Sequence, residues 1–569
     1  MAFAEIVGIA SIVPFMALMG DIGLLEGDTI YARLYVASGL TSPQSFLFLA
    51  GVMVLTSLTV GAVISTFTIW RLALFGTKVG AEIADRLYRH YMQQNWLFHA
   101  NSSSAQLTKQ ITAESGRVTG QIIQPLLQMN ARIVLTVFIV TGTFLYNPWI
   151  AITGAIIFTS AYFILYKVVR TKLQRNGRKI SDLSTTRFRL MNEGFGGIKD
   201  IILLGRREDL IKRFEQSGES IAYAQGTNTA LGQVPRYFME LLAFGSIIAL
   251  ILFLLKSEQG NLSSILPILS VYALAGFKLL PALQLIYSST ASIKGGQAAF
   301  EAIRSDLTES TNTLLIWKEK GNPRFVLSSS ITLKNVTFTY PGKTDPALRN
   351  LDLVIPANKT IGVVGPSGSG KSTMIDILLG LIQPQQGKLL IDDLEVTSDN
   401  LRSWQDSIGF VPQSIFLSEG TIAENVAFGI PVHKIDRLQV NKALALAHLD
   451  DFVQSLSEGI DSKVGERGVQ LSGGQRQRIG IARTLYNDAS VLVFDEATSA
   501  LDGITEKMIM DAIHDFSGQK TIIMIAHRLK TVQKCDVIFY LKDGCVTDVG
   551  TYQALLDKSP EFRRLAEHS

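Results

Sequence analysis

The sequence contains few cysteines and few charged residues, and both shortages narrow the class of protein. Its two cysteines, Cys535 and Cys545, have no second pair beside them that could complete a zinc site. Charged residues make up 18% of the chain, against about 25% in an average soluble protein. The net charge of +4 is too small to indicate nucleic-acid binding. We therefore interpret the cysteines as reduced thiols in a cytosolic domain and expect no nucleic-acid partner.

The amino-terminal segment lacks the features of a signal peptide. Residues 1–20 are apolar apart from Glu5, without a basic n-region or a small-residue cleavage site, so they predict a first transmembrane helix. Because this helix begins without an amphipathic lead-in, we expect that its first turns are missing or that translation starts late. Hydrophobic residues make up 47% of the chain and the mean hydropathy is +0.25, which indicates a membrane protein with a soluble part.

Six apolar segments approach the ~20 residues that a bilayer-spanning helix needs. They cover residues 1–20, 44–75, 126–146, 149–167, 237–255 and 265–289. Lysine and arginine are concentrated in residues 71–117 and 167–236, whose helical patterns predict long cytoplasmic extensions, whereas the opposite loops carry only Arg33 and Lys256. The basic side is predicted to face the cytoplasm, and six spans then leave both termini there.

The periodicity of the sequence changes after the last span. A chain of 569 residues is too long for one core. Residues 1–300 predict a helical membrane domain, and the charged, unpatterned residues 301–329 predict a linker. In residues 330–569 short β-branched strands alternate with helical patterns, which favours an α/β domain with a parallel sheet.

A phosphate-binding loop lies within this second domain. Residues 365–373 fit G-x-x-x-x-G-K-[ST], between a predicted strand, Ile361–Val364, and a helical pattern, Met374–Leu381. Glycines allow backbone N–H groups to turn toward phosphate oxygens, and the helix N-terminus favours the same anion. We expect Lys371 to reach the β- and γ-phosphates and Ser372 to bind Mg²⁺. The predicted loop contacts are Gly365, Pro366, Ser367, Gly368, Ser369, Gly370, Lys371, Ser372 and Thr373.

Two carboxylates end a second predicted strand. Residues 491–494 are apolar and are followed by Asp495 and Glu496. Downstream of a phosphate-binding loop, Asp495 is placed to hold Mg²⁺ through its water shell. Glu496 is placed to polarise the attacking water as general base.

A third motif, Leu471–Gln475, reads Leu-Ser-Gly-Gly-Gln and precedes that strand. Its glycines and helix start again offer backbone N–H groups to an anion. With this motif the chain resembles the ATP-binding-cassette (ABC) superfamily. The resemblance implies a multidomain membrane protein: an all-α six-helix transmembrane domain of the exporter fold, followed by an α/β P-loop nucleotide-binding domain that hydrolyses ATP. It also implies ATP contacts through Ser472, Gly473, Gly474 and Gln475.

Other positions match further motifs of the superfamily. Tyr340 resembles the aromatic residue that stacks on adenine, although a strand tyrosine facing the core is the alternative. Gln413 resembles the glutamine that contacts nucleotide, Mg²⁺ and water. Asp502 resembles the aspartate that crosses between subunits at the ATP site, and His527 the histidine on the γ-phosphate. The expected catalytic residues are therefore Glu496, His527 and Gln413.

The resemblance also implies how the chain assembles. In this superfamily each ATP lies between the phosphate-binding loop (P-loop) of one subunit and the Leu-Ser-Gly-Gly-Gln motif, called the signature motif, of another. One copy of each motif implies a homodimer with two composite sites. The fused order, membrane part first, resembles exporters and implies a multi-pass protein of the bacterial inner membrane with a cytoplasmic ATPase. Turns near Trp96–Ser104 and Gly197–Arg207 would touch the ATPase, unless they are solvated helix connections.

Ionisable residues in or near the spans bear on the cargo. We note Glu5, Arg236, Glu240 and Lys278. A charge at mid-bilayer costs about 2.5–3.5 kcal/mol on insertion scales, so such residues face a cavity or each other. We expect Arg236 and Lys278 to line a substrate cavity, although Arg236 can also snorkel to the cytoplasmic interface. Cations there suit an anionic head group such as a phosphate.

The membrane half resembles bacterial flippases for lipid-linked oligosaccharides of the PglK type, over Ile12–Phe15, Val234–Glu240 and Phe277–Ala282. The resemblance implies transport of a polyprenyl-diphosphate glycan. Lys278 stands where that group tends to carry arginine, which loses bidentate phosphate geometry. Alternatives are an exporter of phospholipid, peptide or drug, a soluble DNA-clamping ATPase, and a nucleotide-gated channel. The apolar spans, with no strong basic stripe, argue against the DNA clamp, and the intact Glu496 argues against the channel.

Overall fold

The computed structural model describes most of the chain, in two compact units. It describes all residues except 1, 21, 27–28, 147, 258–261, 314–323, 466–467, 469–470, 497–505, 509, 511–512, 514, 527 and 568–569. The first unit comprises Met1–Gln94 and Phe98–Trp317, and the second comprises Asn95–Leu97 and Lys318–Ser569.

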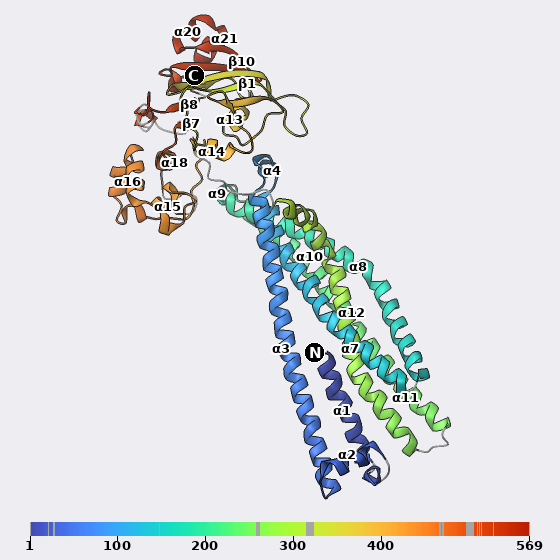
Figure 1. Ribbon diagram of the computed structural model, residues 1–569. Coiled ribbons are helices and arrows are strands. Elements are labelled where there is room, and N and C mark those ends of the chain that lie inside the picture. Colours follow the sequence, from blue (N-terminus) through green and yellow to red (C-terminus); the bar gives the residue numbers. More distant parts are fainter. Residues whose placement is uncertain are drawn as a thin grey trace. The chain divides into compact units, whose positions relative to one another are not determined.

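Long helices build the first unit (Figure 1). They are α1 (Ala2–Gly20), α3 (Pro43–Met92), α7 (Gln124–Tyr146), α8 (Pro148–Gly196), α10 (Arg207–Gln233), α11 (Pro235–Ser257) and α12 (Leu262–Thr313). Shorter elements join them: η1 (Ile22–Leu25), α2 (Ile30–Ser38), α4 (Trp96–Asn101), α5 (Ser104–Lys109), η2 (Gln110–Glu114), α6 (Ser115–Val118), η3 (Thr119–Ile123) and α9 (Ile198–Leu203).

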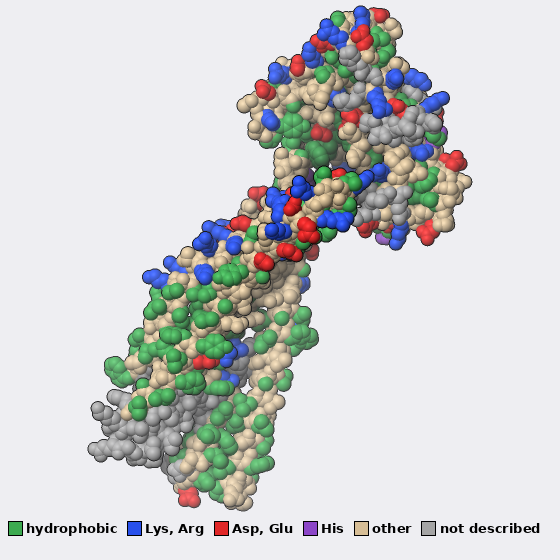
Figure 2. Space-filling view, turned by 180° about the vertical axis from the view of Figure 1, so that it is seen from behind, with side chains coloured by type: hydrophobic (Ala, Val, Ile, Leu, Met, Phe, Trp, Pro, Cys, Tyr) green, Lys and Arg blue, Asp and Glu red, His purple; other side chains and the backbone are tan. Residues whose placement is uncertain are grey.

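The longest helices far exceed the thickness of a bilayer. With 52 residues, α12 would measure about 78 Å at 1.5 Å per residue, against ~30 Å of hydrocarbon. Three described helical segments are long and apolar enough to cross a membrane: Pro43–Met92, Ser104–Leu145 and Ala151–Gly196. The other predicted spans include side chains outside the described set. Figure 2 shows hydrophobic side chains over one end of the helical unit and charged side chains gathered at its other end.

A buried group of charges stabilises the charged end of this unit. The side chain of Glu114 is fully buried and lies 3.0 Å from Lys109 Nζ and 2.9 Å from Arg117 Nη1. It also accepts a hydrogen bond from the hydroxyl of Ser181. Because Ser181 belongs to α8, these contacts fasten the segment from α5 to α6 against α8.

The second unit contains two β-sheets. The antiparallel sheet has the order β2-β1-β4-β5 and the other sheet β10-β9-β3-β8-β7-β6. The strands are β1 (Ser330–Phe338), β2 (Leu348–Pro356), β3 (Thr360–Val364), β4 (Gln386–Ile391), β5 (Leu394–Glu395), β6 (Ile408–Val411), β7 (Val491–Asp495), β8 (Thr521–Ile525), β9 (Val537–Lys542) and β10 (Cys545–Gly550). All pairs of the second sheet are parallel except β9 with β10. The prediction of a parallel sheet therefore holds for these strands and missed the antiparallel sheet.

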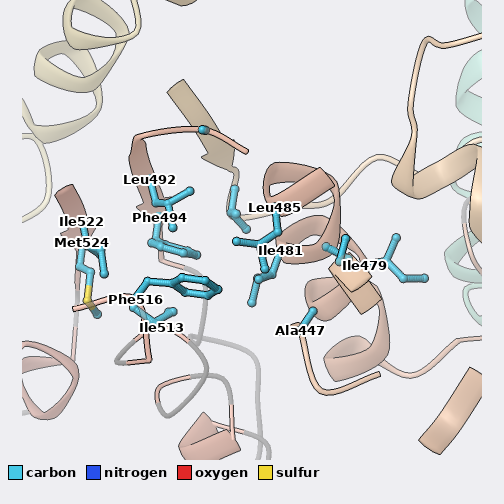
Figure 3. Close-up of a cluster of buried hydrophobic side chains, with 14 of the residues drawn as sticks. Ala447, Ile479, Ile481, Leu485, Leu492, Phe494, Ile513, Phe516, Ile522 and Met524 are labelled. Carbon is cyan, nitrogen blue, oxygen red and sulfur yellow. The ribbon is translucent and has the colours of Figure 1, made fainter. Parts of the chain in front are cut away.

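Helices surround the sheets of the second unit. They are α13 (Lys371–Leu378), α14 (Leu401–Gln405), α15 (Ile422–Val426), α16 (Arg437–Leu446), α17 (Asp450–Gln454), α18 (Gly473–Tyr486), α20 (Tyr552–Lys558) and α21 (Pro560–Glu567). Apolar side chains of α18, including Ile481 and Leu485, join Leu492 and Phe494 of β7 in one buried core (Figure 3). This packing fixes the helix that follows the signature motif against the strand that ends in Asp495.

Candidate functional site

The phosphate-binding loop joins β3 to α13, as the sequence predicts. All five residues of β3 are buried, which is typical of a strand in a parallel sheet covered on both faces. Gly370 has φ +99°, and a Cβ there would lie 2.8 Å from the carbonyl oxygen of Ala347. Both conditions require glycine. The loop backbone can therefore face an anion at the N-terminus of α13.

Lys371 is folded onto this loop. Its Nζ donates to the carbonyl oxygens of Gly365, at 2.8 Å, and Pro366, at 2.9 Å, and the residue is 6% exposed. Burial lowers the pKa of Lys371, and the negative charges of Glu496 and Asp495 oppose that change. The ammonium group therefore lies within the field of both carboxylates at the end of β7, Asp495 and Glu496.

Two neighbouring strands bring two of the three predicted catalytic side chains together. Gln413 follows β6, and β6 pairs with β7, which ends at Asp495. Gln413 Nε2 donates to Glu496 Oε2 at 2.7 Å. Glu496 has φ +48°, a left-handed conformation that is uncommon for a side-chain-bearing residue and is found at functional sites.

Tyr340 lies beside the first turn of α13. Its hydroxyl is 3.1 Å from Thr373 Oγ1, and its ring meets the ring of Phe338 edge-on with centroids 5.0 Å apart. The side chain is half-buried at the edge of the core. This position next to the phosphate-binding loop suits a residue that contacts a nucleotide base.

The signature motif, Leu471–Gln475, forms the N-terminal cap of α18. Ser472 Oγ accepts from the backbone N–H of Gln475 at 3.2 Å, and Gln475 Oε1 accepts from the N–H of Ser472 at 2.8 Å. This reciprocal capping box fixes the helix start. Ser472 and Gly473 are exposed, so this helix N-terminus is accessible from outside the unit. Two other predicted residues, Asp502 and His527, lie outside the described residues.

Sequence analysis missed one acidic residue near this site. Asp376 lies on α13, and burial, with a smaller contribution from the charge of Asp495, raises its pKa to about 6. A hydrogen bond from the side chain of Trp96 acts in the opposite direction. Asn95–Leu97 belong to the second unit, and Leu97 packs against its core. No motif marks Asp376, because only the fold brings it close to Trp96 and Asp495.

The first unit contains a cationic cavity of about 580 Å³. Lys278 lines it, as does Arg132 of α7, which lies inside a predicted span and was overlooked in the sequence. Arg236 lines a different cavity of about 240 Å³ and donates from Nε to Glu240 Oε1 at 2.7 Å. The two cavities share Pro281 and Leu285 of α12. Arg236 and Lys278 therefore lie in adjoining cavities rather than in one. The side chain of Glu5 lies outside the described set.

A helical membrane unit joined to an α/β unit with a P-loop, a signature helix and paired carboxylates defines an ABC exporter. Residues 14–273 match the model of the ABC transporter transmembrane region, and residues 348–499 match that of the ABC transporter ATP-binding part. The chain belongs to the ABC transporters, an integral membrane protein that couples ATP hydrolysis to transport.

Similar proteins include lipid flippases. The chain is 29% identical over 522 residues to an ATP-dependent lipid A-core flippase of Photobacterium profundum, covering 91% of this chain and 86% of that protein. It is 28% identical over 524 residues to the ATP-dependent lipid A-core flippase of Escherichia coli K12, covering 91% and 87%. A bacterial Atm1-family ABC exporter with ATP bound has a similar fold, with a TM-score of 0.78, 22% identity and coverage of 99% and 98%.

Proposed function

We propose that this exporter is a flippase for a lipid whose head group carries phosphate and sugar. A polyprenyl-diphosphate-linked oligosaccharide is the first candidate cargo. The observation that carries the proposal is that Lys278 and Arg132 line the same cavity in the membrane unit. Two cations favour a head group with more than one negative charge, and the guanidinium of Arg132 offers bidentate geometry that Lys278 does not.

A second candidate cargo shares this chemistry. The relatives named above are lipid A-core flippases, and a diphosphate-linked glycan and a phosphorylated glycolipid both join anionic phosphate to sugars and hydrocarbon chains. The two candidates differ in their chains, which are isoprenoid in one and acyl in the other. If the cargo were a peptide or drug without phosphate, the presence of Lys278 and Arg132 in one cavity would have no explanation.

The residues near the phosphate-binding loop fit ATP with Mg²⁺. Among the described residues no group of three or more His, Cys, Asp and Glu could enclose a metal. This agrees with Mg²⁺ sites that use one or two carboxylates, phosphates and water. Ser372, Asp495 and Gln413 would hold the ion, whose charge would stabilise the phosphates. Glu496, oriented by Gln413, would accept the proton of the attacking water.

Two copies of the chain would complete the ATP sites. The exposed Ser472 and Gly473 at the start of α18 are available to the nucleotide of a second copy. The predicted turn at α9 exposes apolar side chains, with Leu203 at 74% and Leu204 at 72% exposed. Apolar surface of this kind marks an interaction site, and we assign it to the ATPase of the partner. The ATPase would lie on the cytoplasmic side of the inner membrane, as the distribution of lysine and arginine predicts.

Reconstitution into liposomes with a panel of fluorescent lipids tests the cargo. The panel contains a polyprenyl-diphosphate glycan, a lipid A-type phosphoglycolipid, phosphatidylglycerol and a neutral glycolipid. We expect ATP-dependent loss of a phosphate-bearing glycolipid from one leaflet, with stimulation of ATP hydrolysis by the same lipid. Transport of the neutral glycolipid at an equal rate would contradict the proposed cargo.

Charge-removing variants connect that transport to the cavity. Lys278→Gln and Arg132→Gln should each raise the lipid concentration for half-maximal stimulation by about tenfold, which corresponds to about 1.4 kcal/mol. Lys172→Gln is the matched control, because it removes an exposed positive charge of α8 that does not line the cavity. Equal behaviour of all three variants would argue against a head-group site at Lys278.

A further inference from the structure

The membrane unit contains a second large cavity with a different character. It has a volume of about 500 Å³ and is enclosed by α7, α8, α11 and α12. No charged residue is among the described residues that line it, which are mostly aliphatic or small. This volume falls within the range of about 300–1,000 Å³ that is usual for small-molecule sites.

Three hydroxyl groups in its wall are satisfied by their own helices. Thr143 donates to the carbonyl oxygen of Val140 at 2.9 Å, Thr153 donates to that of Trp149 at 2.9 Å, and Ser246 donates to that of Leu242 at 2.7 Å. These three donors are already used, whereas the hydroxyl of Thr136 is buried without a hydrogen-bond partner. The rest of the wall presents chiefly methyl and methylene groups, so the cavity suits a ligand that is mainly hydrocarbon.

Small residues leave this space open. Gly154 of α8 and Gly276 of α12 line the cavity, and a Cβ built on either would meet no atom within 4 Å. Side chains added at these two positions would project into free volume.

A third cavity shares lining residues with both this space and the cationic cavity. Leu280 of α12 lines both the apolar cavity and the cavity of Arg236. Pro281 and Leu285 line both the cavity of Arg236 and that of Lys278. Lys278, Leu280 and Pro281 lie within one turn of α12, so an amphiphile with its charged end near Lys278 has an apolar cavity lined by the same stretch of helix.

We propose that the apolar cavity between α7, α8, α11 and α12 binds a hydrocarbon chain of the transported lipid. The inference rests on the proposed function, because it assigns the second part of an amphiphile whose head group binds at Lys278 and Arg132. A methylene group that enters the cavity gives up equivalent contacts with other lipid chains, so no hydrophobic free energy is gained. The cavity instead gives the chain a defined position during transport.

Photolabelling of the full-length protein in liposomes tests this site. The probes are a lipid A-type phosphoglycolipid with a diazirine in one acyl chain and a diazirine-bearing polyprenyl diphosphate. We expect adducts on peptides containing residues 151–159 and 275–283. The double variant Gly154→Leu with Gly276→Leu should lower the adduct yield about tenfold, and leucine also favours the helix over glycine. The control Gly142→Leu adds the same side chain to α7, where it lines no part of the cavity and meets no atom within 4 Å.

Three results would overturn the proposal: an unchanged adduct yield in the double variant, equal labelling of exposed α3 positions such as Leu55 by surrounding lipid, and a cross-link from residue 154 to a second copy.

Head-group function is measured separately through Lys278→Gln. If that variant loses stimulation while the double glycine variant labels and transports normally, the chain site fails and the proposed function stands. If the cavity is labelled but no panel lipid moves with ATP, the proposed function fails and the cavity remains a hydrocarbon site.

Discussion

Replacement of Glu496 by glutamine tests the assignment of the general base most directly. The two side chains have the same shape, and a glutamine would keep an oxygen that can accept from Gln413 Nε2, now at 2.7 Å from Glu496 Oε2. Glutamine also meets the φ of +48° at the same cost as glutamate. The change therefore removes the basic group and its charge and leaves the position of the side chain intact.

The expected magnitude follows from the role of the lost group. General-base catalysis contributes about 10²–10⁴-fold, or about 2.7–5.5 kcal/mol, so Glu496→Gln should lower the rate of ATP hydrolysis by that factor. ATP binding should persist, because Lys371 and the glycine loop are unchanged. The charge of Glu496 favours the protonated form of Lys371, so its loss lowers the pKa of Lys371 further. Because Lys371 stays in place, we expect the affinity for ATP to change less than tenfold, about 1.4 kcal/mol.

The assay is steady-state hydrolysis in liposomes, with binding of a fluorescent ATP analogue measured on the same sample. Glu458→Gln is the matched control, because Glu458 is an exposed glutamate of the same unit. Hydrolysis by Glu496→Gln at the parental rate would refute the reasoning and move the base elsewhere. Loss of binding together with hydrolysis would show that Glu496 acts in holding the site rather than in the proton transfer.

Two further predictions concern stability. The pKa of Asp376 is raised from 3.8 to about 6 by burial, so its contribution to stability is fully present below about pH 4 and is lost as the pH rises through about 6; allowing for solvent screening of this half-buried group, we expect a change of about 1–2 kcal/mol. Thermal unfolding of the second unit from pH 4 to pH 7 should show this dependence, and Asp376→Asn should flatten it; an identical pH profile in the variant would exclude Asp376 as its source. Glu114→Gln should destabilise the helical unit by about 3–5 kcal/mol, because it leaves the buried Lys109 and the largely buried Arg117 without their carboxylate. Glu193→Gln breaks an exposed pair with Arg189 and should cost about 0–1 kcal/mol; equal melting temperatures of the two variants would contradict a stabilising role for the buried charges.

The parts of the ATP site that the sequence reveals are those whose chemistry fixes their spacing. A loop that wraps a phosphate needs glycine at Gly370 and a lysine next to it, so the motif is readable without a fold. The contact between Gln413 and Glu496 depends on β6 lying beside β7, which the resemblance implied and the strand pairing supplies. The antiparallel sheet was missed because the residue types of β1 and β2 resemble those of the parallel strands, and the sequence does not show which strand each of them pairs with.

The proposed cargo site shows where sequence reasoning stops in the membrane unit. Inside an apolar span every face is hydrophobic, so periodicity cannot say which face meets a cavity. Arg132 is a charged residue that can be seen within such a span, but its position beside Lys278 becomes visible only because α7 packs against α12. Arg236 stands out in the sequence as strongly as Lys278, yet it lines an adjoining cavity and pairs with Glu240.

The packing of α12 suggests how the cargo site is linked to the rest of the membrane unit. The helix runs without a break from the cavity at Lys278 to Ile303, which is fully buried in the charged end. Near its middle, Gly295 contacts Gly177 of α8 so closely that a Cβ on Gly177 would overlap the carbonyl of Gly295. Such close backbone contact couples the two helices at this point. We therefore expect a displacement of α8 at its charged end to move α12 as well, and with α12 the lysine that we assign to the head group.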